Sequence, residues 1–548
     1  MGRHAPARPG RHHDHPPRRP PGRRRRSRRP GGRGVSTGRR DAPVGVVAAG
    51  HRLSARAGAE ALAQGGGAVD AVCAAAFAAA VAESPLTGPG AGGFLMVRSP
   101  EGDVALLDFF VAVPGLGPAG RRLDPGDLDS FTVPFGGADQ VFHIGPASVA
   151  VPGMVAGLGE AMRRFGRLPM ADVVAPAVRI AREGVVLTRE AGYLHGILGD
   201  MLTAGPASAA VYAPGGRLLG AGDRLRNDDL ADALETIGRE GPEAMRTGAL
   251  GGAIVEHLGA HGGLVTAEDL AAYRVVDRAP LRVAYRGVTL LTNPPPSSGG
   301  ALIALALRTM EQEASPADDV ARYRAVTRAG VAANAVRDDR FHADLGEEDV
   351  VERLWARRPT GTTHASAVDA HGGMASLSSS NGSGSGVMAP GTGILLNNML
   401  GEEDLNPGGF GQTDPGERMT SMMAPSLLLR DGEPVMALGS AGSNRLRSAI
   451  LQTVVNLVDG GMDVPAAVRH PRVHPEGDGV DVEGGVPDAA VAALVADGHR
   501  LRRWGEMNLF FGGVSAVGAG RDGLDGAGDP RRGGAAVAVT AAGELIGL

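Results

Sequence analysis

The 548-residue sequence contains no lysine, because all 55 of its basic residues are arginine. A phosphate-binding loop of the G-x-x-x-x-G-K-[ST] type is therefore excluded, since its lysine is missing. Cys73 is the single cysteine, so the chain can form no internal disulfide and no cysteine-based zinc site. This thiol lies in an alanine-rich run, and we expect it to be buried and unreactive.

Aromatic residues and long apolar runs are also scarce. Phe, Trp and Tyr make up 3% of the chain, which is unfavourable for stacking nucleic-acid bases. The longest run without a polar residue, 71–82, is shorter than the roughly 18 residues that a membrane-spanning helix needs. With 43% hydrophobic and 21% charged residues, the composition is that of a globular protein. We expect no membrane span and no nucleic-acid partner.

The formal net charge of -5 is unevenly distributed, because residues 1–40 carry 14 arginines and one acid. Residues 1–41 are rich in Arg and Pro and nearly free of apolar side chains, so we predict a disordered tail. It lacks the apolar stretch of a secretory signal, which favours a cytoplasmic location. One alternative is a tail that binds nucleic acid through its charges. The other is an extension without function.

The remaining sequence mixes helical and strand patterns. The segment Asp70–Val81 is apolar on every side and should form a fully buried helix. The spacing of apolar residues predicts further helices at Leu53–Gln64, Val155–Phe165, Met170–Glu183, Asp228–Arg239, Thr266–Tyr273 and Ala301–Glu311. Strand patterns occur at Val44–Ala49, Phe94–Arg98, Val104–Phe110, Thr362–Val368 and Met374–Ser379.

Gly88, Gly90 and Gly93 match the dinucleotide fingerprint G-x-G-x-x-G by letter. That fingerprint requires a strand before it and a helix after it, so that the pyrophosphate meets a helix N-terminus. Here a predicted helix precedes the glycines and a predicted strand follows them. We therefore expect no nicotinamide or flavin site.

From residue 361 onward the composition shifts to Ser, Thr, Gly and Asn, and the run SSSNGSGSG follows a predicted hairpin. Small hydroxyl residues and glycines bring backbone N–H groups close to a ligand, which suits an oxyanion or an anionic substrate. The same composition is typical of a flexible surface loop. Composition alone leaves both interpretations open.

Eight sequence blocks resemble the gamma-glutamyltranspeptidase family of N-terminal nucleophile hydrolases, in the order that family has them. They are AVDAVCAAAF, VPGMVAGLGEAMRRFGRLP, LVTAEDLAAYRV, PLRVAYRG, NPPPSSGG, TTHASAVDAHG, PGTGILLNN and GAGDPRRGG. The resemblance extends over nearly all of residues 50–548. It implies an α+β fold, a four-layer αββα sandwich of two stacked antiparallel sheets between helical layers.

The resemblance also implies that the chain cuts itself before the first Thr of the TTH motif, Thr362. The products would be a large chain ending at Gly361, with its ordered part at residues 42–361, and a small chain of residues 362–548. The two chains would remain associated as a heterodimer.

Physical chemistry gives a reason for such a cut. A threonine hydroxyl is a poor nucleophile at neutral pH and needs a base within reach. A freed α-amine titrates near about 7.7, close to the pH at which a general base is most useful. Thr362 would then carry nucleophile and base in one residue. Gly361 permits the close backbone approach that an intramolecular attack requires.

Further positions carry over from the family motifs. The implied oxyanion donors are the backbone N–H groups of Gly442 and Ser443, and Ser380 would position the nucleophile. The residues implied to bind substrate are Asn381, Glu402, Thr420 and Ser421. No metal and no organic cofactor is implied.

One position departs from the family. The usual LDFR motif reads LDFF here, with Phe110 where an arginine holds the substrate carboxylate. Losing a charge-assisted pair costs roughly 1.5 to 3 kcal/mol of binding. Either another arginine replaces it, with Arg98 and Arg445 as candidates, or the acyl group is not γ-glutamyl.

The sequence therefore predicts an acyltransferase or hydrolase that cleaves a γ-glutamyl amide such as glutathione through an acyl-threonine intermediate. The acceptor would be water or an amine. A first alternative is a related acylase that acts on a different dicarboxylic acyl amide. A second, of another class, is an uncleaved and inactive family member that serves as a binding protein.

Overall fold

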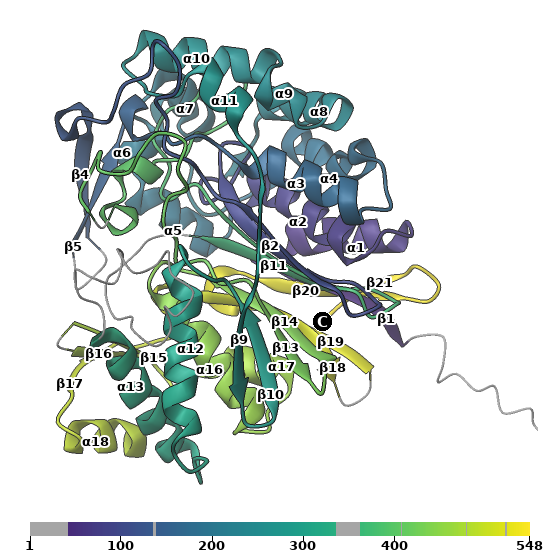
Figure 1. Ribbon diagram of the computed structural model, residues 1–548, viewed down its shortest axis with the longest axis vertical. Coiled ribbons are helices and arrows are strands. Elements are labelled where there is room, and N and C mark those ends of the chain that lie inside the picture. Colours follow the sequence, from purple (N-terminus) through teal and green to yellow (C-terminus); the bar gives the residue numbers. More distant parts are fainter. Residues whose placement is uncertain (1–41, 135–138, 336–361, 407, 478, 521–522) are drawn as a thin grey trace, which may run out of the picture. The chain divides into compact units, whose positions relative to one another are not determined.

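The structure is a computed structural model that describes residues 42–134, 139–335, 362–406, 408–477, 479–520 and 523–548. Two antiparallel β-sheets stack on each other between layers of helices (Figure 1). This confirms the expected αββα sandwich. The predicted tail and Gly361 lie outside the described residues.

The first sheet has eight strands, and every neighbouring pair in it is antiparallel. In spatial order they are β21 (Leu545–Gly547), β20 (Ala535–Thr540), β1 (Pro43–Ala49), β11 (Thr363–Val368), β12 (Met374–Ser380), β2 (Gly92–Arg98), β3 (Val104–Phe109) and β8 (Val276–Arg278).

The second sheet has six strands and is also antiparallel throughout. Its spatial order is β19 (Gly523–Gly528), β18 (Gly513–Gly520), β14 (Glu433–Ala441), β13 (Ser426–Arg430), β10 (Val288–Thr292) and β9 (Leu281–Tyr285).

Segments from before and after position 362 are combined in both sheets. In the first sheet, β11 lies between β1 and β12, with Ala365 opposite Ala49 and Thr363 opposite Ser379. In the second sheet, β10 pairs with β13. A cut before Thr362 would therefore leave two chains joined through shared backbone hydrogen bonds.

The facing surfaces of the two sheets are apolar. Val46 and Met96 of the first sheet belong to the same buried cluster as Leu427 and Val517 of the second. Side chains alternate between the two faces of a strand, so the same strands also supply residues to the outer helical layers.

Helices cover the outer face of the first sheet (Figure 1). All fifteen residues of α2 (Ala68–Ala82) are buried, as its apolar sequence predicts, and Cys73 is among them. The other helices on this side are α1 (Arg52–Ala63), α3 (Met154–Phe165), α4 (Met170–Glu183), α8 (Asp228–Glu240), α9 (Glu243–Arg246), α10 (Ala249–Ala260) and α11 (Ala267–Ala272).

The outer face of the second sheet packs against another group of helices. They are α12 (Ser298–Glu311), α13 (Asp319–Ala335), α16 (Arg445–Val458), α17 (Val464–Arg469) and α18 (Asp488–Ala496). A small sheet of β15 (Val473–Glu476), β16 (Gly479–Val482) and β17 (Arg500–Arg503) adjoins them. The remaining elements are α5 (Arg189–Ile197), α6 (Gly199–Leu202), α7 (Pro206–Tyr212), β4 (Asp129–Pro134), β5 (Asp139–Ile144), β6 (Val185–Val186) and β7 (Arg224–Leu225).

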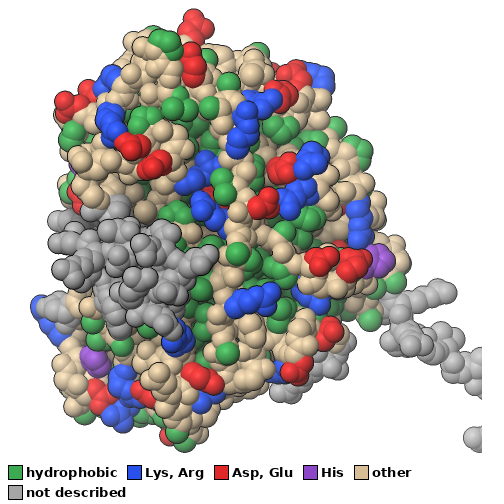
Figure 2. All heavy atoms as spheres, in the orientation of Figure 1, with side chains coloured by type: hydrophobic (Ala, Val, Ile, Leu, Met, Phe, Trp, Pro, Cys, Tyr) green, Lys and Arg blue, Asp and Glu red, His purple; other side chains and the backbone are tan. Residues whose placement is uncertain are grey.

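Of the glycines in the fingerprint-like run, Gly88 and Gly90 lie between α2 and β2 and Gly93 lies in β2, so a helix precedes the run and a strand follows, as expected. None of the described helices is long and apolar enough to cross a bilayer. On the face shown in Figure 2, the described basic side chains are interspersed with acidic ones. They form no continuous stripe there of the kind that binds a nucleic-acid backbone.

A buried network of charges supports the C-terminal part of the fold. Arg531 forms a bidentate pair with Glu483 at 2.7 and 2.5 Å and also contacts Asp529 at 3.0 Å. Asp529 in turn pairs with Arg472 at 2.6 Å. All four side chains are almost completely buried, so each charge depends on its partners.

We expect Arg531→Met to lower the free energy of unfolding by about 3 to 5 kcal/mol, because it leaves Glu483 buried without its counter-charge. Urea denaturation measures this loss. Arg503→Met is the control, since Arg503 pairs with Asp488 on the surface and such pairs contribute little. Equal stabilities of the two variants would contradict the role assigned to the network.

Candidate active site

Thr362 directly precedes β11 and is 1% exposed. Because Thr363 lies opposite Ser379 on β12, the next residue of β12, Ser380, lies beside Thr362. Ser380 is also buried, and its hydroxyl accepts a hydrogen bond from the N–H of Gly382 at 2.8 Å. The structure thus brings Thr362 together with the hydroxyl predicted to position it.

The second sheet carries Gly442 and Ser443 to the same end of the sandwich. A Cβ on Gly439 of β14 would lie 2.3 Å from the His364 ring, so this strand runs directly against β11. Gly442 and Ser443 follow the end of β14 and have positive φ values of 119° and 62°. They precede the N-terminus of α16, where the helix dipole favours negative charge. This turn suits the predicted oxyanion donors.

Gly442 has no room for a side chain. A Cβ there would lie 2.6 Å from the Cα of Gly512 and 3.2 Å from Nη2 of Arg532. The positive φ and the close approach together require glycine at this position.

The Ser- and Gly-rich segment of residues 380–398 is buried except at Pro390 and Gly391, which decides against the flexible surface loop that its composition allowed. Asn397 donates to the carbonyls of Gly90 and Ala150 at 2.8 and 2.9 Å. Asn398 accepts from the backbone N–H of Ser383 at 3.0 Å. The asparagine side chains thus satisfy backbone groups that would otherwise be buried without partners.

Asn381 contributes an unusual acceptor to this region. Its Nδ2 donates to the carbonyls of Pro85 and Leu395 at 3.3 and 3.4 Å. Its Oδ1 is buried and has no hydrogen-bond partner among the described residues. A buried acceptor without a partner is costly, so this oxygen is available for a donor on a ligand.

The other predicted substrate residues lie around the same segment. Glu402 is buried and accepts from the N–H of Ser383 at 3.3 Å. The Thr420 hydroxyl donates to the carbonyl of Leu405 at 3.2 Å, in the turn that follows Glu402. The Ser421 hydroxyl accepts from Met423 N–H at 3.0 Å. These contacts position the side chains of Glu402, Thr420 and Ser421, as the preceding ones position Asn381. They do not assign roles to them.

Phe110 lies where the family arginine is expected, and its surroundings are apolar. The side chain is 1% exposed and stacks on Phe94 with ring centroids 5.6 Å apart. The preceding acid, Asp108, is already paired with Arg278 at 2.7 Å and with Arg418 at 3.4 Å. Asp108 therefore engages both of these arginines.

Of the two arginines suggested as replacements, Arg98 is in the wrong place. It lies at the far end of β2, opposite Met374, whereas Gly92 at the other end lies opposite Ser380. A seven-residue strand spans about 20 Å, so Arg98 cannot reach the nucleophile. Arg445 lies two residues after Ser443, but its guanidinium covers the Phe510 ring at 4.6 Å.

His364 of the TTH motif is not a general base. Both ring nitrogens are engaged, Nδ1 with the Ser378 hydroxyl at 2.8 Å and Nε2 with the Ser366 hydroxyl at 2.9 Å. Burial lowers the pKa of His364 to about 3. The ring is therefore neutral at pH 7, and its role is to pack between the sheets.

Glu83 is a site residue that the sequence did not reveal. The Thr363 hydroxyl donates to its Oε2, and the Ser54 hydroxyl donates to its Oε1 at 2.8 Å. Burial raises the pKa of the Glu83 carboxyl. This acid fixes the residue that follows the nucleophile. It is the residue directly after α2 and lies 280 positions away from Thr363 in the sequence.

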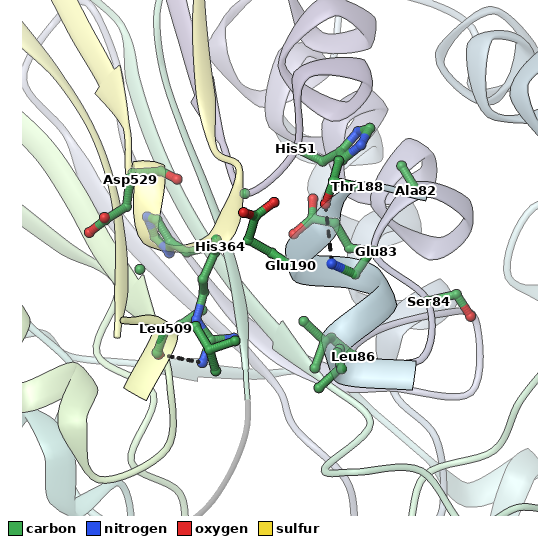
Figure 3. A pocket seen from close by; sticks show the side chains of 17 residues that line it. His51, Ala82, Glu83, Ser84, Leu86, Thr188, Glu190, His364, Leu509 and Asp529 are labelled. Carbon is green, nitrogen blue, oxygen red and sulfur yellow. Dashed lines mark hydrogen bonds between the residues drawn. The ribbon is translucent and has the colours of Figure 1, made fainter. Parts of the chain in front are cut away.

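A cavity opens beside these residues (Figure 3). Its walls come from α2 and the loop after it, from α5, and from the ends of β11, β14 and β18. It is lined by Gly50, His51, Ala82, Glu83, Ser84, Leu86, Thr188, Glu190, Ala191, Leu194, His364, Ala441, Leu509, Gly513, Ser515, Asp529 and Arg532. Two of them, His364 and Ala441, are within two residues of Thr362 and Gly442.

The described residues include no group of three or more His, Cys, Asp or Glu side chains arranged to hold a metal ion.

Known proteins resemble this chain over most of its length. The sequence profile of gamma-glutamyltranspeptidase matches residues 54–354 and 327–539. The acylase ACY 1 proenzyme of Pseudomonas sp. (strain V22) is 34% identical, over 90% of this chain and 94% of its own. The glutathione hydrolase proenzyme of Escherichia coli (strain K12) is 30% identical, over 89% and 91%.

Among solved structures, cephalosporin acylase from Bacillus halodurans superimposes with a TM-score of 0.76 at 27% identity. The match covers 90% of this chain and 96% of that one.

We expect Glu83→Gln to change how stability depends on pH. The raised pKa means that the folded state holds the Glu83 proton more tightly than the unfolded state does. Wild-type stability is therefore lost as the pH rises from about 4.5, the unfolded value, through the folded pKa. Glutamine keeps the shape and cannot ionise, so the variant should melt at a higher temperature than wild type at pH 8 and equally at pH 4.5.

Thermal unfolding measured from pH 4.5 to pH 8 tests this expectation. Glu256→Gln is the matched control, because Glu256 is exposed on α10. If the melting temperatures of Glu83→Gln and wild type change in parallel over this pH range, the Glu83 carboxyl does not have a raised pKa in the folded state.

Proposed function

The chain belongs to the gamma-glutamyltranspeptidase family, and from this premise we propose that it is a self-processing amide hydrolase and acyltransferase with Thr362 as nucleophile. The observation that carries the proposal is the position of Thr362, buried at the start of a central strand and at the same end of the sandwich as the Gly442–Ser443 turn. The names of the two curated relatives describe proenzymes, which supports a maturation cut in this chain as well.

Self-cleavage would start from the precursor. The Thr362 hydroxyl oxygen attacks the carbonyl carbon of Gly361, and the peptide bond to the Thr362 nitrogen breaks as that nitrogen takes up a proton. Water then hydrolyses the ester between Gly361 and the Thr362 oxygen. The products are a large chain of residues 1–361 and a small chain of residues 362–548 with a free α-amine, held together by the shared sheets.

The mature residue would then repeat the same chemistry on a substrate. The Thr362 α-amine accepts the hydroxyl proton while the oxygen attacks the amide carbonyl. The N–H groups of Gly442 and Ser443 stabilise the negative oxygen that forms. The α-amine returns the proton to the leaving amine. Water or a second amine releases the acyl group from Thr362.

For the acyl group we favour a dicarboxylic acyl chain that lacks the amino group of glutamate and whose far carboxylate is not bound at the position of Phe110. The apolar packing of Phe110 against Phe94 supports this choice, since no cation occupies the position of the family arginine. The acylase relative at 34% identity is consistent with it. A γ-glutamyl amide such as glutathione is the second candidate, favoured by the glutathione hydrolase relative at 30% identity.

We expect purified wild-type protein to contain a second chain that begins at Thr362. Its mass would be about 19 kDa, the share of the 55.7 kDa total that residues 362–548 represent. N-terminal sequencing and intact mass detect it. Thr362→Ala removes the attacking hydroxyl and should remain a single inactive chain, whereas Thr362→Ser keeps the hydroxyl and should be cut.

A wild-type chain that stays intact after long incubation would instead indicate an uncleaved family member that acts as a binding protein. If Thr362→Ala is still cut between residues 361 and 362, Thr362 is not the nucleophile of the cleavage.

Two amides that differ only by the glutamyl amino group test the acyl group. We expect glutaryl para-nitroanilide to be hydrolysed with a kcat/KM at least about ten times that of γ-glutamyl para-nitroanilide. Both carry the same far carboxylate, but the glutamyl ammonium group would lose water without the orientation that the family arginine gives it, at a cost of about 1.5 to 3 kcal/mol. Release of nitroaniline gives both rates. The reverse preference would support a glutathione hydrolase.

A further inference from the structure

Arg532 lines the cavity beside the predicted nucleophile and has little to balance its charge. Its Nη2 donates to the carbonyl of Leu509 at 3.5 Å, which is a long hydrogen bond. Its Nε is buried and has no partner among the described residues. Within that part of the chain, no carboxylate lies at ion-pair distance from Arg532. The adjacent Arg531, by contrast, contacts two carboxylates.

The other ionisable groups of the cavity are already engaged or neutral. Asp529 pairs with Arg472 and Arg531. Glu83 accepts hydrogen bonds from two hydroxyls, and burial raises its pKa. Burial lowers the pKa of His51 to about 4 and that of His364 to about 3. Only Glu190, on the partly exposed side of the cavity, remains as another charged group, and no ion pair joins it to Arg532 in the described structure.

This imbalance costs free energy, because a guanidinium removed from water needs a counter-charge. Burial lowers the pKa of Arg532 to about 10, and the attraction of Asp529 and Glu83 offsets this only in part. An anionic group on a ligand would supply the ion-pair contact that the described residues do not.

The cation also lies close to the reacting atoms. A Cβ on Gly442 would be 3.2 Å from Nη2 of Arg532, so the guanidinium adjoins the predicted oxyanion turn. The side chains of Leu86 and Leu509 lie along one edge of the cavity, away from the carboxylates of Glu83 and Glu190 (Figure 3). An apolar chain or ring that ends in a carboxylate matches such walls.

We propose that Arg532 binds a carboxylate of the substrate in this cavity and thereby sets the specificity of the enzyme. The inference rests on the proposed function and supplies a cation in place of the arginine that Phe110 replaces. The carboxylate has two possible sources. It could be at the far end of a dicarboxylic acyl chain, or it could be carried by the leaving amine. Both offer the same chemistry to the guanidinium.

Two pairs of substrates separate these sources. The first pair is glutaryl and pentanoyl para-nitroanilide, which differ by a carboxylate at the end of the acyl chain. The second pair is glutaryl para-nitroanilide with and without a carboxylate on the aniline ring. We expect wild type to favour the carboxylate-bearing member of one pair by at least about tenfold in kcat/KM.

Arg532→Gln should lower that preference by about 10- to 100-fold, mainly through KM, and Arg532→Lys should keep part of it because the charge remains. Arg98→Gln is the matched control. Arg98 is also buried with an unpaired Nε and bonds to backbone carbonyls, but it lies at the far end of β2. The control should keep the wild-type preference.

Arg532→Gln should also melt no lower than wild type, because it removes an unbalanced charge rather than an ion pair. If Arg532→Gln keeps the wild-type preference in both substrate pairs, the inference is wrong. Hydrolysis of these amides by wild type would still support the proposed function in that case. A large loss of stability in Arg532→Gln would assign Arg532 a structural role, and the inference would then be wrong as well. If wild type hydrolyses none of these amides, the proposed function fails and the inference fails with it.

Discussion

The position of β11 in the middle of an eight-stranded sheet is the constraint on which the rest of the site depends. Its backbone hydrogen bonds to β1 on one side and β12 on the other fix Thr363 and the residues after it. A nucleophile must be held within a fraction of an ångström of its target, and rigid elements do this better than loops. Thr362 is the first residue beyond this fixed strand. It is therefore held firmly on its C-terminal side, while its N-terminal bond is the one proposed to break.

The same arrangement explains how a cut in the middle of the chain is compatible with a stable fold. Strands from the two sides of Thr362 are interleaved in the first sheet and meet at β13 and β10 in the second, so neither part has a complete sheet of its own. Separation of the two chains would break ladders of hydrogen bonds and expose the apolar layer between the sheets. The cut proposed before Thr362 breaks none of these strand pairings.

Local sequence signals predicted the elements well. Thr266 caps α11 and Asp269 completes a capping box, and the apolar segment of α2 is buried on every side, as its composition indicates. The hairpin of β11 and β12 followed from alternation. The order of strands in each sheet did not follow, because pairing depends on contacts between residues hundreds of positions apart. The resemblance to a known family supplied the two stacked sheets between helical layers, along with Thr362 and the Gly442–Ser443 turn, but not the order of the strands.

The adjacent residues Arg531 and Arg532 show where a sequence stops being informative. Both belong to the block GAGDPRRGG, and nothing in the letters distinguishes them. The turn after β19 directs Arg531 into a network with Glu483 and Asp529, which holds this end of the fold together. The same turn directs Arg532 into the cavity, next to Gly442. A guanidinium that contributes little to folding in such a place lowers stability unless a ligand completes its interactions. Its position beside the predicted oxyanion turn is therefore best explained by the substrate it would meet there.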